Sequence, residues 1–223
     1  MDKIQNLKKA YQILKRYDVL SRISVVFGQY RPLSENEFVG HVLANEEWIK
    51  TIRVFLDMDN TLFRFSYGKA DNMVMLERMY DKGFFESLEP MRNIDIYEAF
   101  IFMGAKVYIL STCIDSEHCK AEKMASIEKH MPFIPKRNIL FAPVGESKIE
   151  FAKKHAHLKT LENVFLIDDY KGNLTDWSAH GGIAIKKAMS YKIRPYPTLL
   201  DHRDVVDMVL SLANKTQKEG DML

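Results

Sequence analysis

Five short runs rich in β-branched and aromatic residues, separated by stretches of helical periodicity, constrain the fold of this chain more than any other feature. The runs are "IRVFL" (52–56), "AKVYIL" (105–110), "RNILFA" (137–142), "NVFLID" (163–168) and "GGIAIK" (181–186). The helical patterns between them cover residues 92–103, 116–130, 146–157 and 171–180. Strands joined by helical crossovers run parallel. The chain is therefore predicted to be an α/β protein built on a parallel sheet.

The residues before the first run carry helical patterns instead. Apolar residues recur at spacings of three and four in residues 3–17, which predicts an amphipathic helix with a lysine-rich outer face. Ser34 and Glu37 have the spacing of a capping box and open a second helix, which is predicted to end near Trp48. These patterns predict a helical segment before the sheet.

The length of 223 residues, with 47% hydrophobic residues, suits one sizeable core with a small accessory element. We expect an N-terminal helical extension over residues 1–50 and a core domain over residues 51–223. A small helical cap is expected within the core domain, at about residues 64–91, between the first two runs. The apolar residues of its helical pattern are Met73, Val74, Leu76, Met79 and Tyr80.

Polar and charged residues follow the predicted strands. In an open parallel sheet, ligands bind beyond the carboxyl ends of the strands, near the point where the strand order reverses. The residues at those ends are Asp57, Asp59 and Thr61 after the first run, Ser111 and Thr112 after the second, Lys148 after the third, and Asp168 and Asp169 after the fourth. The sheet is therefore expected to gather carboxylates, hydroxyls and one ammonium group in one place.

Carboxylates that lie a few ångströms apart repel one another and raise one another's pKa unless a cation shares the site. Magnesium takes oxygen ligands and is usually held by one or two carboxylates together with a substrate phosphate. Asp57 and Asp168 suit such an ion better than any histidine or cysteine of the chain. The pattern predicts a site for Mg²⁺ and a phosphate group.

The order and type of these residues resemble the haloacid dehalogenase-like phosphohydrolases, on the motifs "DMDNTL", "YILST", "GESK" and "LIDDYKGN". The resemblance implies a Rossmann-like core in which Asp57 is the nucleophile that forms an aspartyl-phosphate and Asp59 is the general acid and base. It also implies that Ser111 and Lys148 hold the phosphoryl oxygens. Its implied metal ligands are Asp57, the main-chain carbonyl of Asp59, Asp168 and Asp169, while Thr61 is expected to fix the loop.

The stretch from about residue 52 to 187 is also similar to the 5'(3')-deoxyribonucleotidase family, through "GFFESLEPM", "CKAEKMASIEKHMP" and "LIDDYKGNLTDWSAHGGIAIK". This resemblance implies a deoxyribonucleoside monophosphate as substrate. Its expected substrate-binding residues are Thr112, Phe65, Phe84 and Phe85. The chain has Asn60 and Thr61 where that family commonly has glycine and valine.

Other interpretations of these residues stay open. The enzyme could hydrolyse a different phosphorylated metabolite, such as a sugar phosphate, or the chain could be a non-catalytic phosphate-binding module. Individually, Asp57 and Asp59 could be a solvated strand end, and Lys148 could be a surface lysine. Ser111, Thr112, Asp168 and Asp169 could cap helices.

Composition limits the partners and the compartment. The formal net charge is +2 with no concentrated basic block, so no nucleic-acid polymer is expected as a partner. No apolar stretch reaches the ~18 residues of a membrane span, and Cys113 and Cys119 match neither a disulfide framework nor a zinc site. We expect a cytoplasmic protein, and a homodimer is left open. His118, His130, His155 and His157 do not form a pattern that binds metal.

Overall fold

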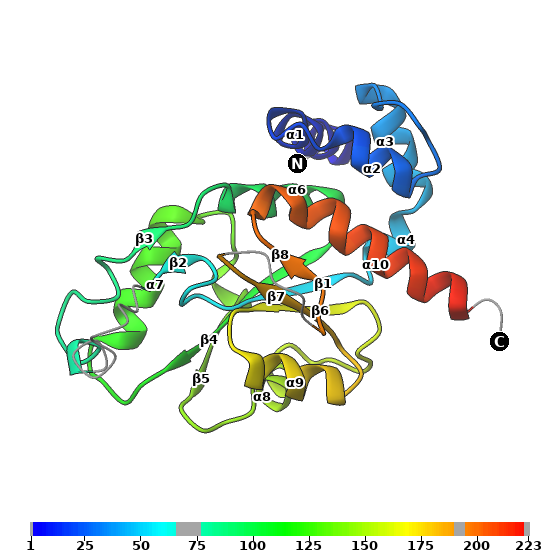
Figure 1. The fold of residues 1–223 in the computed structure, drawn as a ribbon. Helices are drawn as coiled ribbons and strands as arrows, with labels where there is room; N and C mark the ends of the chain where they lie inside the picture. Colours follow the sequence, from blue (N-terminus) through cyan, green and yellow to red (C-terminus); the bar gives the residue numbers. More distant parts are fainter. Residues whose placement is uncertain (1, 66–76, 190–194, 221–223) are drawn as a thin grey trace.

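The structure is a computed structural model that describes residues 2–65, 77–189 and 195–220. Its centre is a six-stranded parallel sheet in the order β5-β4-β1-β6-β7-β8 (Figure 1). The strands are β1 (Arg53–Leu56), β4 (Lys106–Cys113), β5 (Ile139–Pro143), β6 (Val164–Asp168), β7 (Ile183–Lys187) and β8 (Thr198–Leu199). The prediction of an α/β fold with a parallel sheet is confirmed.

Strand β1 lies between β4 and β6, and this position fixes where a site can form. The chain passes from β1 to β4 and β5 on one side, then returns to β6, β7 and β8 on the other. The order of strands therefore reverses at β1, and a crevice forms beyond the carboxyl ends of strands at such a point.

Helices precede the sheet and connect its strands. The N-terminal helices are α1 (Lys3–Arg16), α2 (Leu20–Val26), α3 (Glu35–Ala44) and α4 (Glu46–Ile49). The later helices are α6 (Tyr97–Met103), α7 (Cys119–His130), α8 (Lys148–His155), α9 (Lys171–Ala179) and α10 (Val205–Gly220). Short 3-10 turns cover η1 (Ile94–Ile96), η2 (Lys136–Asn138) and η3 (His202–Asp204).

Alternate residues of the strands pack against different helices. Val54 and Leu56 of β1 belong to a large core that includes side chains of α6, α7 and α10. Phe55, between them, points to the opposite face and packs with Trp177 of α9 and residues of α8. This alternation is the period of two of a strand. Because both faces are covered, the central strands carry consecutive apolar residues, such as Val54, Phe55 and Leu56 of β1.

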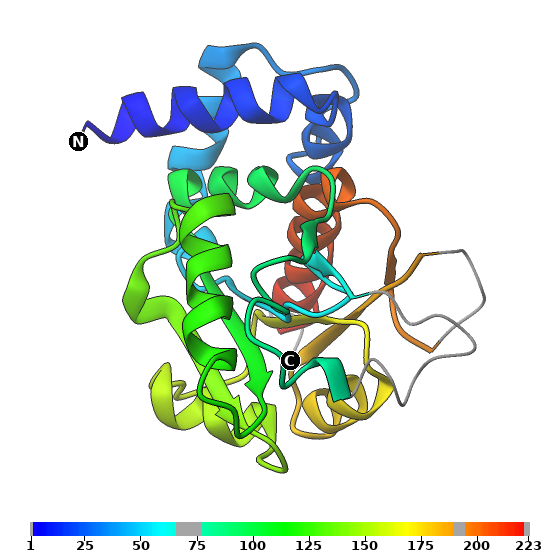
Figure 2. The same cartoon turned by 90° about the vertical axis from the view of Figure 1, so that its left-hand side faces the viewer.

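Helices α1, α2 and α3 form a further layer over the sheet domain, outside α6 and α10 (Figure 2). Helix α1 packs on α6, and α2 packs on α10. The inward residues of α1 are Leu7, Ala10, Tyr11, Ile13 and Leu14, at the spacings that the sequence pattern predicts. They belong to the same apolar core as the strand residues above.

Three features of the N-terminal layer and the C-terminal region differ from the sequence prediction. The helix predicted to run to Trp48 is broken at Asn45, whose side-chain amide donates to the carbonyl of His41 at 2.8 Å and ends α3. Strand β8 and helix α10 were not predicted. Strand β8 has only two residues, in a proline-rich stretch, and is too short to show the alternation of a strand. Helix α10 could have been predicted, because Val205, Val209 and their neighbours have helical spacing.

The segment predicted to be a cap starts and ends at a small antiparallel pair of strands, β2 (Phe63–Arg64) and β3 (Glu89–Pro90). Met73, Val74 and Leu76 of its predicted helix lie outside the described residues. The described part from Glu77 onward consists mainly of turns.

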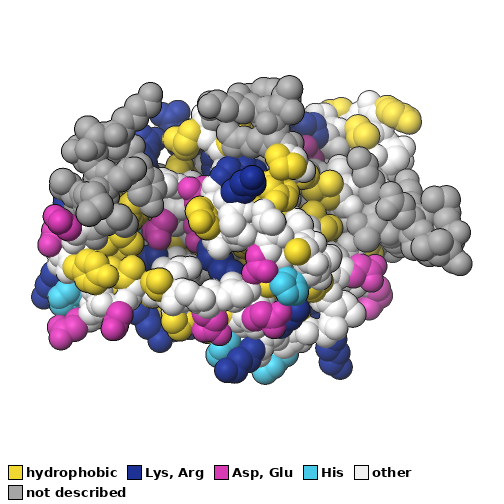
Figure 3. All heavy atoms as spheres, turned by 60° about the horizontal axis from the view of Figure 1, so that its bottom comes forward, with side chains coloured by type: hydrophobic (Ala, Val, Ile, Leu, Met, Phe, Trp, Pro, Cys, Tyr) yellow, Lys and Arg dark blue, Asp and Glu magenta, His cyan; other side chains and the backbone are white. Residues whose placement is uncertain are grey.

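Acidic, basic and histidine side chains are interspersed on the face shown in Figure 3, and hydrophobic side chains lie between them. In the part of the chain that the structure describes, no helix is both long enough and apolar enough to span a bilayer.

Candidate active site

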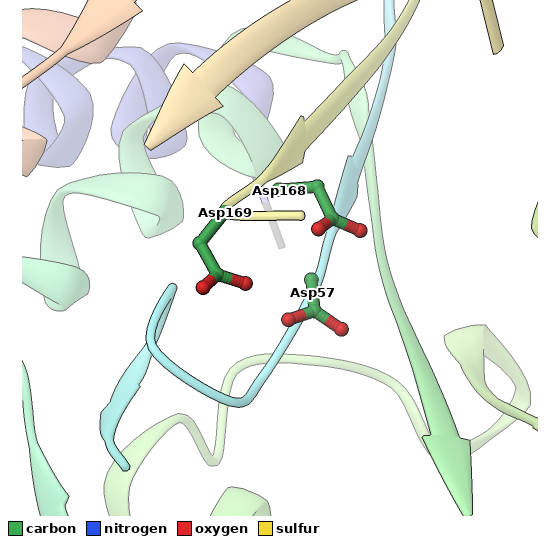
Figure 4. Close-up of side chains that lie close together, drawn as sticks. All are labelled: Asp57, Asp168 and Asp169. Carbon is green, nitrogen blue, oxygen red and sulfur yellow. The ribbon is translucent and has the colours of Figure 1, made fainter. Parts of the chain in front are cut away.

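Asp57 and Asp168 stand at the carboxyl ends of two neighbouring strands. The amide of Asp57 donates to the carbonyl of Ile167 at 3.0 Å, so the β1–β6 ladder continues to the first acid. Asp57, Asp168 and Asp169 each offer one carboxylate oxygen, and these oxygens all lie within 4.8 Å of one another. The three carboxyl groups face a common space beyond the strands (Figure 4). The sheet thus brings together residues that are 111 and 112 positions apart in the sequence.

Lys148 lies between the first two acids. It is the first residue of α8, where Ser147 caps the helix by accepting from the amide of Glu150. Its ammonium donates to Asp57 Oδ1 at 2.5 Å and to Asp168 Oδ2 at 2.8 Å. All three side chains are buried. A surface role for Lys148 does not agree with this arrangement.

The electrostatics of this cluster are set by burial. Burial raises the pKa of Asp57 well above its usual range, Lys148 opposes this shift, and the charge of Asp168 adds to it. Burial would lower the pKa of Lys148, but the carboxylates of Asp57 and Asp168 outweigh it and raise that pKa. Burial, with the charge of Asp168, raises the pKa of Asp169 to about 6. Burial therefore disfavours the negative charge of Asp57 and of Asp169.

Hydrogen bonds hold the second acidic pair in place. Asp168 accepts from the amide of Tyr170 at 2.7 Å and from the side chain of Asn173 at 2.8 Å. The side chain of Asn60 lies near Asp169 and opposes the rise of its pKa. Asn60 has a φ of +57°, a left-handed conformation that asparagine and glycine adopt more readily than other residues. The backbone conformation at position 60 thus suits an asparagine as well as a glycine.

Asp59 is not part of the acidic cluster. Its Oδ2 accepts from the ammonium of Lys123 at 2.6 Å. The same ammonium donates to Ser111 Oγ at 2.9 Å and to the carbonyl of Thr112 at 2.8 Å. Lys123 therefore joins the predicted acid of the first loop to the predicted hydroxyl group at the end of β4.

Sequence analysis did not identify Lys123 as a site residue. The signal was present, because Lys123 lies on the inward face of α7 with Cys119, Ser126 and Ile127, at helical spacing. A lysine on such a face has to find acceptors. Which acceptors it finds depends on the packing of α7 against the loops.

The first loop is also fixed from the opposite side of the site. The carbonyl of Thr61 accepts from Nε2 of the buried His202, whose Nδ1 accepts from the hydroxyl of Tyr97, both at 2.8 Å. The side-chain oxygen of Thr61 is buried and has no hydrogen-bond partner among the described residues.

The three predicted phenylalanines gather in one cluster beside the site. Phe65, Phe84 and Phe85 are buried together with Cys119. The rings of Phe65 and Phe84 have centroids 5.3 Å apart, and those of Phe84 and Phe85 are 5.1 Å apart. Phe85 also lies 4.6 Å from the ammonium of Lys123. Phe85 thus lies next to Lys123, and Phe84 and Phe65 pack behind it in the same cluster.

The acidic cluster fits a hard divalent cation. Its donors are carboxylate oxygens, which Mg²⁺ prefers, and the raised pKa values of Asp57 and Asp169 show that a positive charge is favoured there. Within the described residues, no other group of three histidine, cysteine or acidic side chains has this geometry.

The chain is similar to known proteins in its fold. No protein-family model and no curated protein sequence matches the chain. A haloacid dehalogenase-like hydrolase structure from Xanthomonas campestris aligns with a TM-score of 0.54 and 11% identity, over 75% of this chain and 98% of that one. The chain has the haloacid dehalogenase-like fold. In this fold the paired strands β1 and β6 end side by side, at the acidic cluster.

Two further solved structures have lower scores. A hydrolase of the same superfamily from Ehrlichia chaffeensis has a TM-score of 0.48 and 11% identity, over 72% of this chain and 96% of that chain. A phosphatase domain from Bacteroides fragilis in complex with magnesium has a TM-score of 0.38 and 13% identity, over 89% of this chain and 51% of that chain.

Proposed function

We propose that this chain is a magnesium-dependent phosphomonoesterase that works through an aspartyl-phosphate, with (deoxy)nucleoside monophosphates as substrates. The observation that carries the proposal is the position of Asp57. Its carboxylate is buried at the end of the central strand and is bonded to Lys148, with Asp168 and Asp169 within metal-sharing distance. A solvated strand end requires none of these features.

In the first step, an oxygen of Asp57 attacks phosphorus as the bond from phosphorus to the leaving oxygen breaks. Asp59 gives a proton to that leaving oxygen, so the alcohol departs neutral. The positive charge of Lys148, beside Asp57, offsets the charge of the transferring group. The hydroxyl of Ser111 donates a hydrogen bond to a phosphoryl oxygen.

In the second step, water attacks the phosphorus of the aspartyl-phosphate. Asp59 takes a proton from this water, the bond from phosphorus to Asp57 breaks, and inorganic phosphate leaves. The carboxylate of Asp57 and the protonated Asp59 are then restored for the next cycle.

Asp57, Asp168 and Asp169, with the carbonyl of Asp59, would hold the magnesium ion. When bound, Mg²⁺ supplies positive charge that offsets these carboxylates and the substrate phosphate. Lys148 and Asn173 keep Asp168 oriented as a ligand, through their bonds to Oδ2.

The test of the nucleophile is phosphate release from an aryl phosphate in the presence of magnesium. We expect Asp57→Asn to lower kcat/KM by at least ~10³-fold, because the reaction then has no covalent route. Asp115→Asn, at an exposed acid in the loop after β4, is the matched control and should retain wild-type activity. Equal release by wild type and Asp57→Asn would contradict the proposal.

The substrate class is tested with a panel of nucleoside monophosphates and sugar phosphates. The nucleotide proposal is supported by the sequence resemblance and by the position of Phe65, Phe84 and Phe85 beside the site. A higher kcat/KM for nucleoside monophosphates is expected. A preference for sugar phosphates would contradict the nucleotide proposal and leave the phosphatase proposal in place.

A further inference from the structure

Lys123 makes contacts that neither the acidic cluster nor the proposed reaction requires. Its side chain is only 1% exposed, and its three ammonium protons match the three acceptors around it, Asp59 Oδ2, Ser111 Oγ and the carbonyl of Thr112. An ammonium held by three acceptors in this way has a fixed position. It can therefore fix the positions of the groups that accept its hydrogen bonds.

The first of those groups is the carboxylate of Asp59. Lys123 occupies Oδ2, while Oδ1 is buried and has no hydrogen-bond partner among the described residues. A buried carboxylate oxygen without a donor is costly, and Oδ1 is the oxygen of Asp59 that still lacks a hydrogen-bond donor in the described part of the chain. Lys123 thus determines which oxygen of Asp59 remains for proton transfer.

The second group is the hydroxyl of Ser111, which is fully buried. Because Ser111 Oγ accepts from Lys123, its own proton has to point in another direction. That proton remains for a phosphoryl oxygen. One side chain therefore orients both an acid and a hydroxyl donor.

The helix that carries Lys123 also holds the cap. The carboxylate of Glu122 accepts from the amides of Gly83 and Phe85 at 2.5 Å and 3.0 Å. Ser126 donates to the carbonyl of Phe85 at 3.2 Å, and the Phe85 ring lies over the Lys123 ammonium. Helix α7 therefore contacts Asp59 and Ser111 through Lys123, and the predicted cap segment through Glu122 and Ser126.

We propose that Lys123 is a positioning residue for proton transfer by Asp59: it holds Oδ2, leaves Oδ1 as the oxygen without a partner within the described residues, and orients the hydroxyl of Ser111. This inference rests on the proposed phosphatase function. It assigns to Lys123 no contact with the substrate and no bond to phosphorus.

The test compares two phosphate esters that differ in their need for an acid. p-Nitrophenyl phosphate has a leaving group that departs without a proton, whereas 2-phenylethyl phosphate releases an alkoxide that needs one. We expect Lys123→Met to lower kcat/KM for the alkyl ester ~10²-fold or more, the range for loss of general-acid catalysis, and for the aryl ester by less than ~10-fold. Magnesium is present throughout.

The ratio of the two kcat/KM values is the decisive quantity, because a change in the amount of folded enzyme cancels from it. Lys120→Met, at an exposed position of the same helix, is the control and should leave the ratio unchanged. If Lys123→Met is too unstable to purify, Lys123→Gln gives the same ratio, because it also lacks the ammonium.

Equal loss of activity toward both esters would overturn the inference, since it would show that Lys123 does not act through the proton transfer of Asp59. Retention of full activity toward both would also overturn it. A wild-type protein that releases phosphate from neither ester, or an Asp57→Asn variant as active as wild type, would contradict the proposed function and the inference with it.

Discussion

Lys148 is the residue on which the charge balance of the site depends most. It is the buried cation that bonds to both Asp57 and Asp168. Removing one partner of a buried ion pair is costly because it leaves the other charge uncompensated. Here two carboxylates would be left facing each other.

Without metal, Lys148→Met is expected to lower the free energy of unfolding by about 3–5 kcal/mol, the range for a broken buried ion pair. Millimolar Mg²⁺ should restore more stability to this variant than it adds to the wild type, because the ion then supplies the missing positive charge. Urea unfolding with and without Mg²⁺ measures both changes.

Lys153→Met is the control for this comparison. Lys153 lies on the same helix and pairs with Glu150 at the surface, so its loss should change stability by less than about 1 kcal/mol. Equal destabilisation by the two substitutions would contradict the assigned role of Lys148.

The free energy of unfolding is expected to depend on pH through His202. Burial, with the nearby charge of Lys187, lowers the pKa of His202 from 6.5 to about 4. Above pH 6.5, the histidine is neutral in both the folded and the unfolded state. Between pH 6.5 and pH 4, the unfolded state takes up a proton that the folded state does not, so stability falls as pH falls.

We expect His202 to contribute a loss of about 3 kcal/mol in the free energy of unfolding between pH 7 and pH 4, from about 1.4 kcal/mol per pKa unit. The slope of stability against pH should be smaller in His202→Gln. Urea unfolding at several pH values measures it, with the exposed His155→Gln as control. An unchanged slope in His202→Gln would exclude His202 as its source.

At the scale of elements, helix α9 and strand β7 meet at a close contact between Trp177 and Gly182. Trp177 is fully buried, and a β-carbon added at Gly182 would lie 2.4 Å from its indole nitrogen. The turn from α9 into β7 therefore requires a residue without a side chain.

Gly182→Ala is expected to lower the free energy of unfolding by about 1–3 kcal/mol through overpacking against Trp177. Gly40→Ala, in the middle of α3 where an added β-carbon meets nothing within 4 Å, should instead raise it by about 0.5–1 kcal/mol. Thermal unfolding of both variants tests the pair. The same sign for both changes would argue against a close contact at Gly182.

At the scale of the whole molecule, the N-terminal helices share a core with the sheet domain. Leu14 of α1 is fully buried and belongs to the same cluster as Val54 of the central strand. Arg16 and Tyr17 both bond to Asp95, which precedes α6. An N-terminal extension that folded separately would not need to share buried residues with the sheet domain.

Leu14→Ala is expected to lower the stability of the whole chain by about 2–5 kcal/mol in one cooperative transition. Far-UV circular dichroism and the fluorescence of Trp177, in a Trp48→Phe background, should report the same midpoint. Lys15→Ala, at an exposed position of α1, is the control. Two separate transitions would show that residues 1–50 unfold independently.

The alternation of strand and helix patterns predicted the parallel sheet, and the acids at the strand ends predicted which residues would meet. Asp57, Asp168 and Lys148 could be named because parallel strands bring their carboxyl ends to one edge. Their chemical roles, and those of Phe65, Phe84 and Phe85, stay predictions. The break at Asn45 and the short strand β8 were missed because a side-chain bond and a two-residue pairing leave no periodic signal.

The sequence alone determined the α/β class and the set of polar groups at the sheet edge, because periodicity and strand ends are local properties of the chain. Only the tertiary structure decided that Lys123 bonds to Asp59, 64 positions away, and that α1 packs on α6. The physical reason is that an inward lysine or an apolar helix face requires a partner but does not specify one. The partner is chosen when distant elements pack into the same core.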